Sequence, residues 1–269
     1  MEYLIAVDLE GIHGIVGEPY KTLTESFDYK EAAYAAALEI NAAVRALFDN
    51  GATAVYVWDN HGGGNNIDFS YVDKRAVRVD TAGDKRRYDF TLPHNFAGTI
   101  FIGYHSKEGT PKGILAHSYS STAIQYIKLN GEAIGELGTD SFICEMHGIA
   151  PIFAASDDCG ICEIKEYYPD IETVTTKYGR GRNSADFKDR ELVLAEIYNG
   201  VAAAMKKPHP TITKEFPSPS TLEIRYTRAE YAEQVHKKAL SLSVKTEWGE
   251  DTHTLRFVIT KPNEIPLLV

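Results

Sequence analysis

The stretch "YLIAVDLEG", residues 3–11, decides how the rest of the chain is interpreted. Its first five residues are apolar or aromatic, which is typical of a strand buried on both faces of a parallel sheet. The strand leads directly into two acidic residues, Asp8 and Glu10, with Gly11 behind them. Ligands of parallel α/β sheets bind outside the carboxyl ends of the strands. Two carboxylates so close together need a cation, so the pair predicts a metal site.

Strands and helices alternate over most of the chain that follows. Asp28 and Glu31 predict a capping box for a long helix that ends at Asn50-Gly51. Apolar strand patterns and helical patterns then take turns, which predicts an α/β fold: a three-layer α/β/α arrangement with a largely parallel sheet. The later strands are predicted at 52–59, 98–106, 149–158 and 171–179, and the later helices at 138–148 and 186–207.

The composition changes at "KPHPTITKEFPSPS", residues 207–220, where four prolines mark a linker or a domain edge. We therefore predict an α/β domain over 1–207 and a small α+β C-terminal unit over 208–269. In the second unit, Thr227 and Glu230 predict a capping box for a helix. Strands are predicted on both sides of it, at 221–226, 242–248 and 253–260.

Composition excludes several classes of partner. The chain has 269 residues and a formal net charge of −10, which argues against nucleic acid or an anionic membrane as the main partner. No targeting segment is visible and no apolar run approaches the length of a membrane helix, so the cytoplasm is the expected location. Cys144, Cys159 and Cys162 agree with a reducing compartment. For the lone CxxC pair at 159–162, structural thiols are favoured over a zinc ribbon or a redox role.

Two further strands end in potential metal ligands. His61 lies in "DNHGGGNN", residues 59–66, and His105 in "GYHS", residues 103–106. A single residue of this kind is more often a loop residue or a helix cap, so the hypothesis depends on three strand ends meeting at one edge. Zinc accepts this mixture of imidazole and carboxylate, and so do manganese, cobalt and ferrous iron. A carboxylate can also bridge two metals about 3.5–4 Å apart.

Several blocks of the sequence together resemble the zinc-dependent D-aminopeptidase family. They occur in the family's order and cover most of the chain. The blocks are "VDLEG" (7–11), "DNHGGGNNI" (59–67), "GYHSKEGTPKGILAHSYSS" (103–121), "LNGEAIGELG" (129–138), "FAASDD" (153–158) and "TLEIRYTRAEYAE" (221–233).

The resemblance implies a complete active site. Two zinc ions per chain would be held by Asp8, which bridges them, and by the remaining ligands Glu10, His61, His105 and Glu136. Residue spacing alone does not single out Glu136. The resemblance also implies a catalytic His117, acting as nucleophile or as general base. Three departures affect the expected specificity: Ala6 replaces the motif's Ser, "AASDD" (154–158) differs from the family block, and 65–98 matches poorly.

We therefore expect a metal-dependent aminopeptidase that acts on short peptides, with a D-residue at their N-terminus. Asp157 and Asp158 are candidates for holding the substrate's ammonium group. The resemblance implies a homodecamer of two stacked five-membered rings. Two alternatives stay open: a dinuclear hydrolase acting on another amide or ester, and a peptide-binding protein without chemistry.

Overall fold

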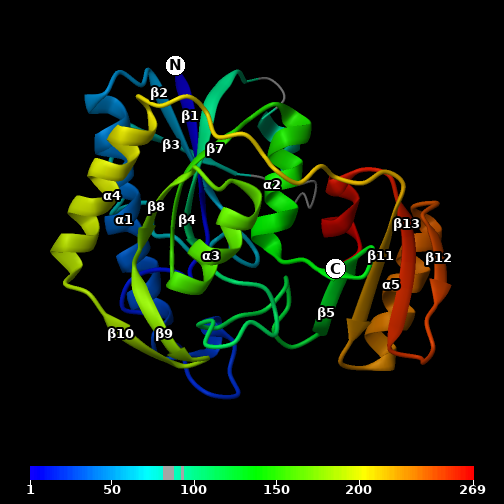
Figure 1. Cartoon of the computed structure of the whole chain (residues 1–269). Helices are drawn as coiled ribbons and strands as arrows, with labels where there is room; N and C mark the ends of the chain where they lie inside the picture. Colours follow the sequence, from blue (N-terminus) through cyan, green and yellow to red (C-terminus); the bar gives the residue numbers. More distant parts are fainter. Residues whose placement is uncertain (81–87, 92–93) are drawn as a thin grey trace.

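The computed structural model describes residues 1–80, 88–91 and 94–269, so parts of the weakly matching region, 81–87 and 92–93, lie outside the described residues. The main sheet has six parallel strands in the order β3-β2-β1-β4-β7-β8, and its topology agrees with the predicted α/β class (Figure 1). Its strands are β1 (Glu2–Val7), β2 (Ala54–Asp59), β3 (Ala76–Val79), β4 (Phe96–Tyr104), β7 (Pro151–Ser156) and β8 (Glu172–Thr175).

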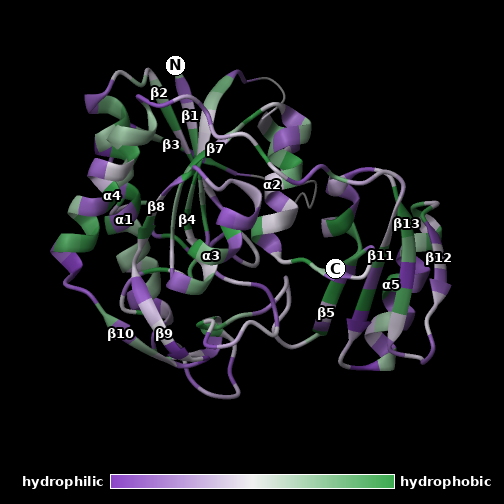
Figure 2. Cartoon of the chain, in the orientation of Figure 1, coloured by the Kyte–Doolittle hydropathy of each residue, from purple (hydrophilic) through white to green (hydrophobic). Residues whose placement is uncertain are grey.

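Helices cover both faces of this sheet, as its buried strands require. Along β1, Ile5 and Val7 join the core cluster of one face, whereas Leu4 and Ala6 join the cluster of the other. The first cluster includes α1 (Tyr29–Asp49) and α4 (Arg190–Ala204). The second includes α2 (Glu136–His147) and α3 (Asp158–Tyr167). Figure 2 shows the hydrophobic residues concentrated along the central strands between these layers.

A second sheet carries the C-terminal part of the chain. It is antiparallel, in the order β12-β13-β11-β5-β6, and α5 (Ala229–Ser241) packs against it. Its strands are β5 (Ile124–Leu129), β6 (Glu132–Ala133), β11 (Ser220–Tyr226), β12 (Lys245–Trp248) and β13 (Thr254–Ile259). β5 and β6 come from the middle of the chain, and the division into 1–207 and 208–269 stays a prediction.

The remaining elements are short. β9 (Lys177–Gly181) and β10 (Ser184–Phe187) form a hairpin, and the 3-10 turns are η1 (Leu23–Glu25), η2 (Asp89–Thr91) and η3 (Pro262–Leu267). The stretch 171–179 was expected to form a single strand, but it divides into β8 and β9, which belong to different sheets. None of the helices in the described ranges combines the length and apolar character needed to cross a bilayer.

Both predicted capping boxes are wrong, because their side chains bind other segments. The Asp28 carboxylate accepts hydrogen bonds from the backbone N–H groups of Val16 and Gly17, at 3.0 and 2.9 Å. Asp28 thus fixes the loop after β1 to the start of α1. The Thr227 hydroxyl donates to the carbonyl of Thr122 at 2.7 Å. This bond joins the segment after β11 to the segment before β5. The helix predicted at 186–207 begins later, at Arg190, where Asp189 caps it through the N–H of Leu192 at 3.1 Å.

Candidate metal centre and active site

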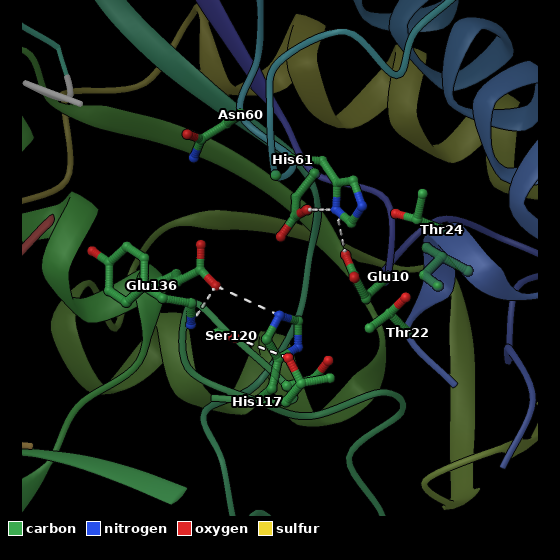
Figure 3. A pocket seen from close by; sticks show the side chains of 14 residues that line it. Glu10, Thr22, Thr24, Asn60, His61, His117, Ser120 and Glu136 are labelled. Carbon is green, nitrogen blue, oxygen red and sulfur yellow. Dashed lines mark hydrogen bonds and ion pairs between the residues drawn. The ribbon is translucent and has the colours of Figure 1, made fainter. Parts of the chain in front are cut away.

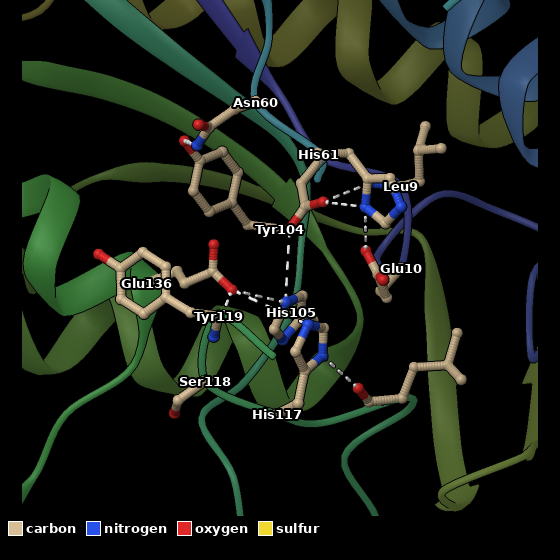
Figure 4. A network of polar contacts seen from close by, with 12 residues as sticks. Leu9, Glu10, Asn60, His61, Tyr104, His105, His117, Ser118, Tyr119 and Glu136 are labelled. Atoms are coloured by element: carbon tan, nitrogen blue, oxygen red, sulfur yellow. Dashed lines mark hydrogen bonds and ion pairs between the residues drawn. The ribbon is translucent and has the colours of Figure 1, made fainter. Parts of the chain in front are cut away.

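The ends of three neighbouring strands build the site. β1 lies between β2 and β4, and Val7 is level with Asp59 on one side and with Ile102 on the other. The residues that follow these strands therefore emerge at one edge of the sheet, as the sequence predicts. Glu136 reaches the same place as the first residue of α2. Figures 3 and 4 show these side chains turned toward one another.

Two glycines allow the ends of β1 and β4 to touch. The N–H of Gly11 donates to the carbonyl of Gly103 at 2.7 Å. A Cβ at Gly11 would lie 2.0 Å from the carbonyl oxygen of Tyr104, and a Cβ at Gly103 would lie 2.1 Å from that of Asp8. Gly103 also has a φ of +73°, which favours glycine. This close approach sets the spacing between the acidic residues after β1 and His105 after β4.

The side chains form two groups that share one carboxylate. Nδ1 of His61 lies 2.9 Å from Oδ1 of Asp8 and 3.1 Å from Oε2 of Glu10. Nε2 of His105 lies 3.4 Å from Oδ2 of Asp8 and 3.5 Å from Oε1 of Glu136. The two oxygens of Asp8 thus face different histidines. This is the geometry expected of a carboxylate that bridges two metal ions.

The donor set fits metal ions. The ligand atoms of Asp8, Glu10 and His61 lie within 4.8 Å of one another, and so do those of His105, His117 and Glu136. Nε2 of His105 is buried and has no hydrogen-bond partner among the residues that the structure describes. A buried imidazole nitrogen that faces two carboxylates without a hydrogen bond is suited to a zinc-class ion.

The electrostatics of the site favour positive charge. Burial raises the pKa of Asp8 to about 7, and the neighbouring Glu10 carboxylate adds to this effect. Burial alone lowers the pKa of His61, but the Glu10 and Asp8 carboxylates outweigh it and hold that pKa well above its usual range. Burial also lowers the pKa of His105, but the Glu136 and Asp8 carboxylates outweigh it and raise that pKa to about 10. A divalent ion can replace the protons that these two imidazoles otherwise hold.

His117 differs from the other two histidines. Its Nδ1 lies 2.9 Å from the carbonyl of Leu115, which can only accept a hydrogen bond, so Nδ1 carries the proton. Nε2 lies 3.9 Å from Oε1 of Glu136, and the ring stacks on His105 with centroids 4.0 Å apart. Burial and the positive charge of His105 lower the pKa of His117 to about 4. The ring is therefore neutral, and its unprotonated Nε2 faces the site.

A cavity of about 200 Å³ opens onto these groups (Figure 3). Asp8, Glu10, His61, His117 and Glu136 all line it, while His105 lies behind His117. The rest of the wall is mostly polar, and its residues were not among the predicted site residues. They include Thr22 before η1, Thr24 within it, Asn60, and the segment 119–122.

Two predicted site residues serve the fold instead. The Asp157 carboxylate caps α3 by accepting from the N–H of Gly160 at 2.9 Å, and it also accepts from the N–H of Ile114 at 3.1 Å. The Asp158 carboxylate accepts from the N–H of Gly179 at 2.8 Å. Neither residue lines the cavity, so the prediction that they hold the substrate's ammonium group is wrong.

None of the three cysteines is part of a disulfide. Cys159 and Cys162 lie in the first turns of α3 as free thiols, and Cys162 is exposed. Burial and the nearby Asp157 carboxylate raise the pKa of Cys159 to about 12, so its thiol stays protonated at neutral pH. Cys144 lies in α2, and its side chain is buried in the core.

The family of this chain follows from its sequence. The family model described as D-aminopeptidase matches residues 1–248. This chain belongs to the D-aminopeptidase family. A member of the family, the D-aminopeptidase of Bacillus subtilis (strain 168), is 28% identical over 189 residues. That match covers 68% of this chain and 66% of the relative, a little under two thirds of its length.

A solved structure shares the fold. It is described as a Zn-dependent D-aminopeptidase, DppA from Bacillus subtilis, a self-compartmentalizing protease. The two structures superpose with a TM-score of 0.85 at 22% sequence identity, over 100% of this chain and 95% of the other. At this identity the likeness shows that the two chains share a fold, and it extends over the whole of this chain.

Proposed function

We propose that this protein is a metal-dependent aminopeptidase that removes the N-terminal residue of short peptides through a dinuclear zinc site, with preference for a D-residue. One observation carries the proposal: two groups of metal-ligand side chains share Asp8 at the carboxyl edge of the parallel sheet. Membership of the D-aminopeptidase family supports the reaction and its stereochemistry. Manganese, cobalt and ferrous iron suit the same donor atoms.

Each ligand has a defined place in this proposal. Glu10 and His61 would hold one ion, His105 and Glu136 the other, and Asp8 would bridge them. When bound, such ions supply Lewis-acid activation of a water molecule and of the scissile carbonyl. The protein orients the second group further, because the N–H of Tyr119 donates to Oε1 of Glu136 at 3.0 Å.

His117 is the proposed catalytic residue. The carbonyl of Leu115 fixes its tautomer and ring orientation, which leaves Nε2 as an acceptor inside the cavity. As a general base, Nε2 takes a proton from the attacking water and then delivers it to the leaving amine. A nucleophilic His117 would use the same nitrogen, but it would require an acyl-histidine intermediate that the general-base route avoids.

The expected substrates, assembly and location follow from size, charge and family. A cavity of about 200 Å³ next to the ligands suits a small N-terminal residue. The solved relative is described as self-compartmentalizing, and we propose a homo-oligomer here, a decamer of two pentameric rings. The net charge of −10 supports a peptide rather than nucleic acid or a membrane as partner. Three cysteines that form no disulfide support a cytoplasmic location.

The proposal is tested by hydrolysis of D-Ala and L-Ala para-nitroanilides by the zinc-loaded protein, before and after chelation. We expect release from the D-substrate that is faster than from the L-substrate and that is lost on chelation. A phosphodiester, bis-para-nitrophenyl phosphate, serves as the control for a different dinuclear hydrolase. Hydrolysis of the phosphodiester with no release from either anilide would contradict the proposal.

A further inference from the structure

A second cavity adjoins the metal centre. Its volume is about 480 Å³, and it is formed by the segments 19–21, 121–122 and 182–183 together with Glu108. Ser121 and Thr122 also line the cavity of the metal centre, so the two spaces are neighbours with a common wall. The loop after β1, the loop between β4 and β5, and the β9–β10 hairpin lie at the same end of the molecule in Figure 1.

The two cavities are lined by different charged side chains. Three carboxylates, those of Asp8, Glu10 and Glu136, line the inner one. Lys21 and Arg182 line the outer one, against the single carboxylate of Glu108. The outer cavity therefore carries Lys and Arg side chains, which the lining of the inner cavity lacks.

Arg182 is the cation in this cavity that is available to an anionic ligand. Nζ of Lys21 already pairs with Oε2 of Glu18 at 2.9 Å. Oε1 of Glu108 accepts a hydrogen bond from the N–H of Gly109 at 3.1 Å. Over the described parts of the chain, no carboxylate pairs with the guanidinium of Arg182, and this residue is exposed.

Arg182 is also held in place relative to His117. Its Nη1 donates to the carbonyl of Ala116, the residue directly before His117. Its own carbonyl accepts from the N–H of Leu115 at 2.9 Å. The amide of Asn183 donates to the carbonyl of Val16 at 2.8 Å, which fixes the hairpin to the loop after β1. The guanidinium therefore lies in the β9–β10 hairpin and is hydrogen-bonded to the loop that carries the proposed catalytic residue.

An aminopeptidase binds its substrate in one direction. The free N-terminus and the scissile carbonyl lie at the metal centre, and the leaving part extends outward. An extended chain advances about 3.3–3.6 Å per residue, so the free carboxylate of a dipeptide or tripeptide lies only one or two residues beyond the scissile bond. The outer cavity shares Ser121 and Thr122 with the cavity of the metal centre, so it is an adjoining space that such a carboxylate can enter.

We propose that the outer cavity is the subsite for the leaving portion of the peptide and that Arg182 binds its C-terminal carboxylate. The inference rests on the proposed function and deepens it, because it assigns a residue that recognises the free carboxyl group of a short peptide. Guanidinium groups bind carboxylates through paired, charge-assisted hydrogen bonds. Peptide amides and longer peptides, whose carboxylate lies beyond the cavity, are the poorer substrates.

The test compares D-Ala-D-Ala with its C-terminal amide in the zinc-loaded protein. Wild type should prefer the free acid, and Arg182→Gln should raise KM for the acid about tenfold while KM for the amide stays within about twofold. Arg182→Lys should restore part of the preference. The matched control is Arg180→Gln, because Arg180 is exposed in the same hairpin and pairs with Asp186. This control should leave both substrates unchanged.

Three results test whether Arg182 binds the C-terminal carboxylate. Equal loss on acid and amide in Arg182→Gln would overturn the proposal, because it would mean that Arg182 only supports the His117 loop. No preference for the acid in wild type would also overturn it. If wild type hydrolyses neither dipeptide nor D-Ala para-nitroanilide, the proposed function has failed. Calorimetric binding of D-Ala-D-Ala then decides the subsite: weaker binding to Arg182→Gln supports it, and equal binding overturns it.

Discussion

Gly11→Ala is the substitution that most directly perturbs the spacing of the metal ligands. The new Cβ would lie 2.0 Å from the carbonyl oxygen of Tyr104, against the 3.0 Å below which real Cβ contacts are essentially never found. The ends of β1 and β4 must therefore separate by about 1 Å, which moves Glu10 away from His105. A displacement of this size at a catalytic centre costs about 100-fold in rate. The strain should also lower the free energy of unfolding by about 1–3 kcal/mol.

Release from D-Ala para-nitroanilide, zinc content and urea unfolding measure these effects on the same sample. Gly63→Ala is the matched control, since a Cβ at Gly63 meets nothing within 4 Å although the residue lies in the loop that carries His61. We expect the control to keep wild-type activity. If Gly11→Ala kept full activity and zinc content, the contact between the strand ends would not be what positions the ligands, and the reasoning would be refuted.

Three further substitutions test other parts of the account. His117→Gln should lower kcat by about 100-fold or more and leave zinc content unchanged, as elemental analysis of the same sample checks. Lys177→Met should lower the free energy of unfolding by about 3 kcal/mol or more in urea. It removes the buried ammonium that donates to three backbone carbonyls between residues 10 and 15. Burial raises the pKa of Glu39 from 4.5 to about 7, so the folded state holds this proton more tightly than the unfolded state. Stability should therefore fall as pH rises from about 4.5 to about 7, by on the order of 3 kcal/mol, and Glu39→Gln should remove that fall in urea unfolding.

The sequence predicts the strand ends of the site well because they obey a local rule. An apolar run that stops at Asp8, His61 or His105 can be recognised from a few residues, and parallel strands bring such ends to one edge. Glu136 follows no such rule. It begins a helix far along the chain, and only the family resemblance points to it.

The errors come from polar side chains whose partners are distant in sequence. Asp28 has the spacing of a helix cap but binds the loop at Val16, and Asp157 looks like an exposed acid but is buried as the cap of α3. Local pattern cannot tell which of several N–H groups a carboxylate will accept from. The place of Arg182 in the outer cavity could not be predicted for a similar reason, because a hairpin whose position depends on tertiary packing brings it there.

Zinc stoichiometry tests the central claim most directly. The purified protein is reconstituted with zinc, freed of loosely bound metal, and analysed for zinc per chain. Because Asp8 faces both ligand groups, the account predicts two tightly held ions per chain. A ratio of one, or no retained zinc, would contradict a dinuclear centre.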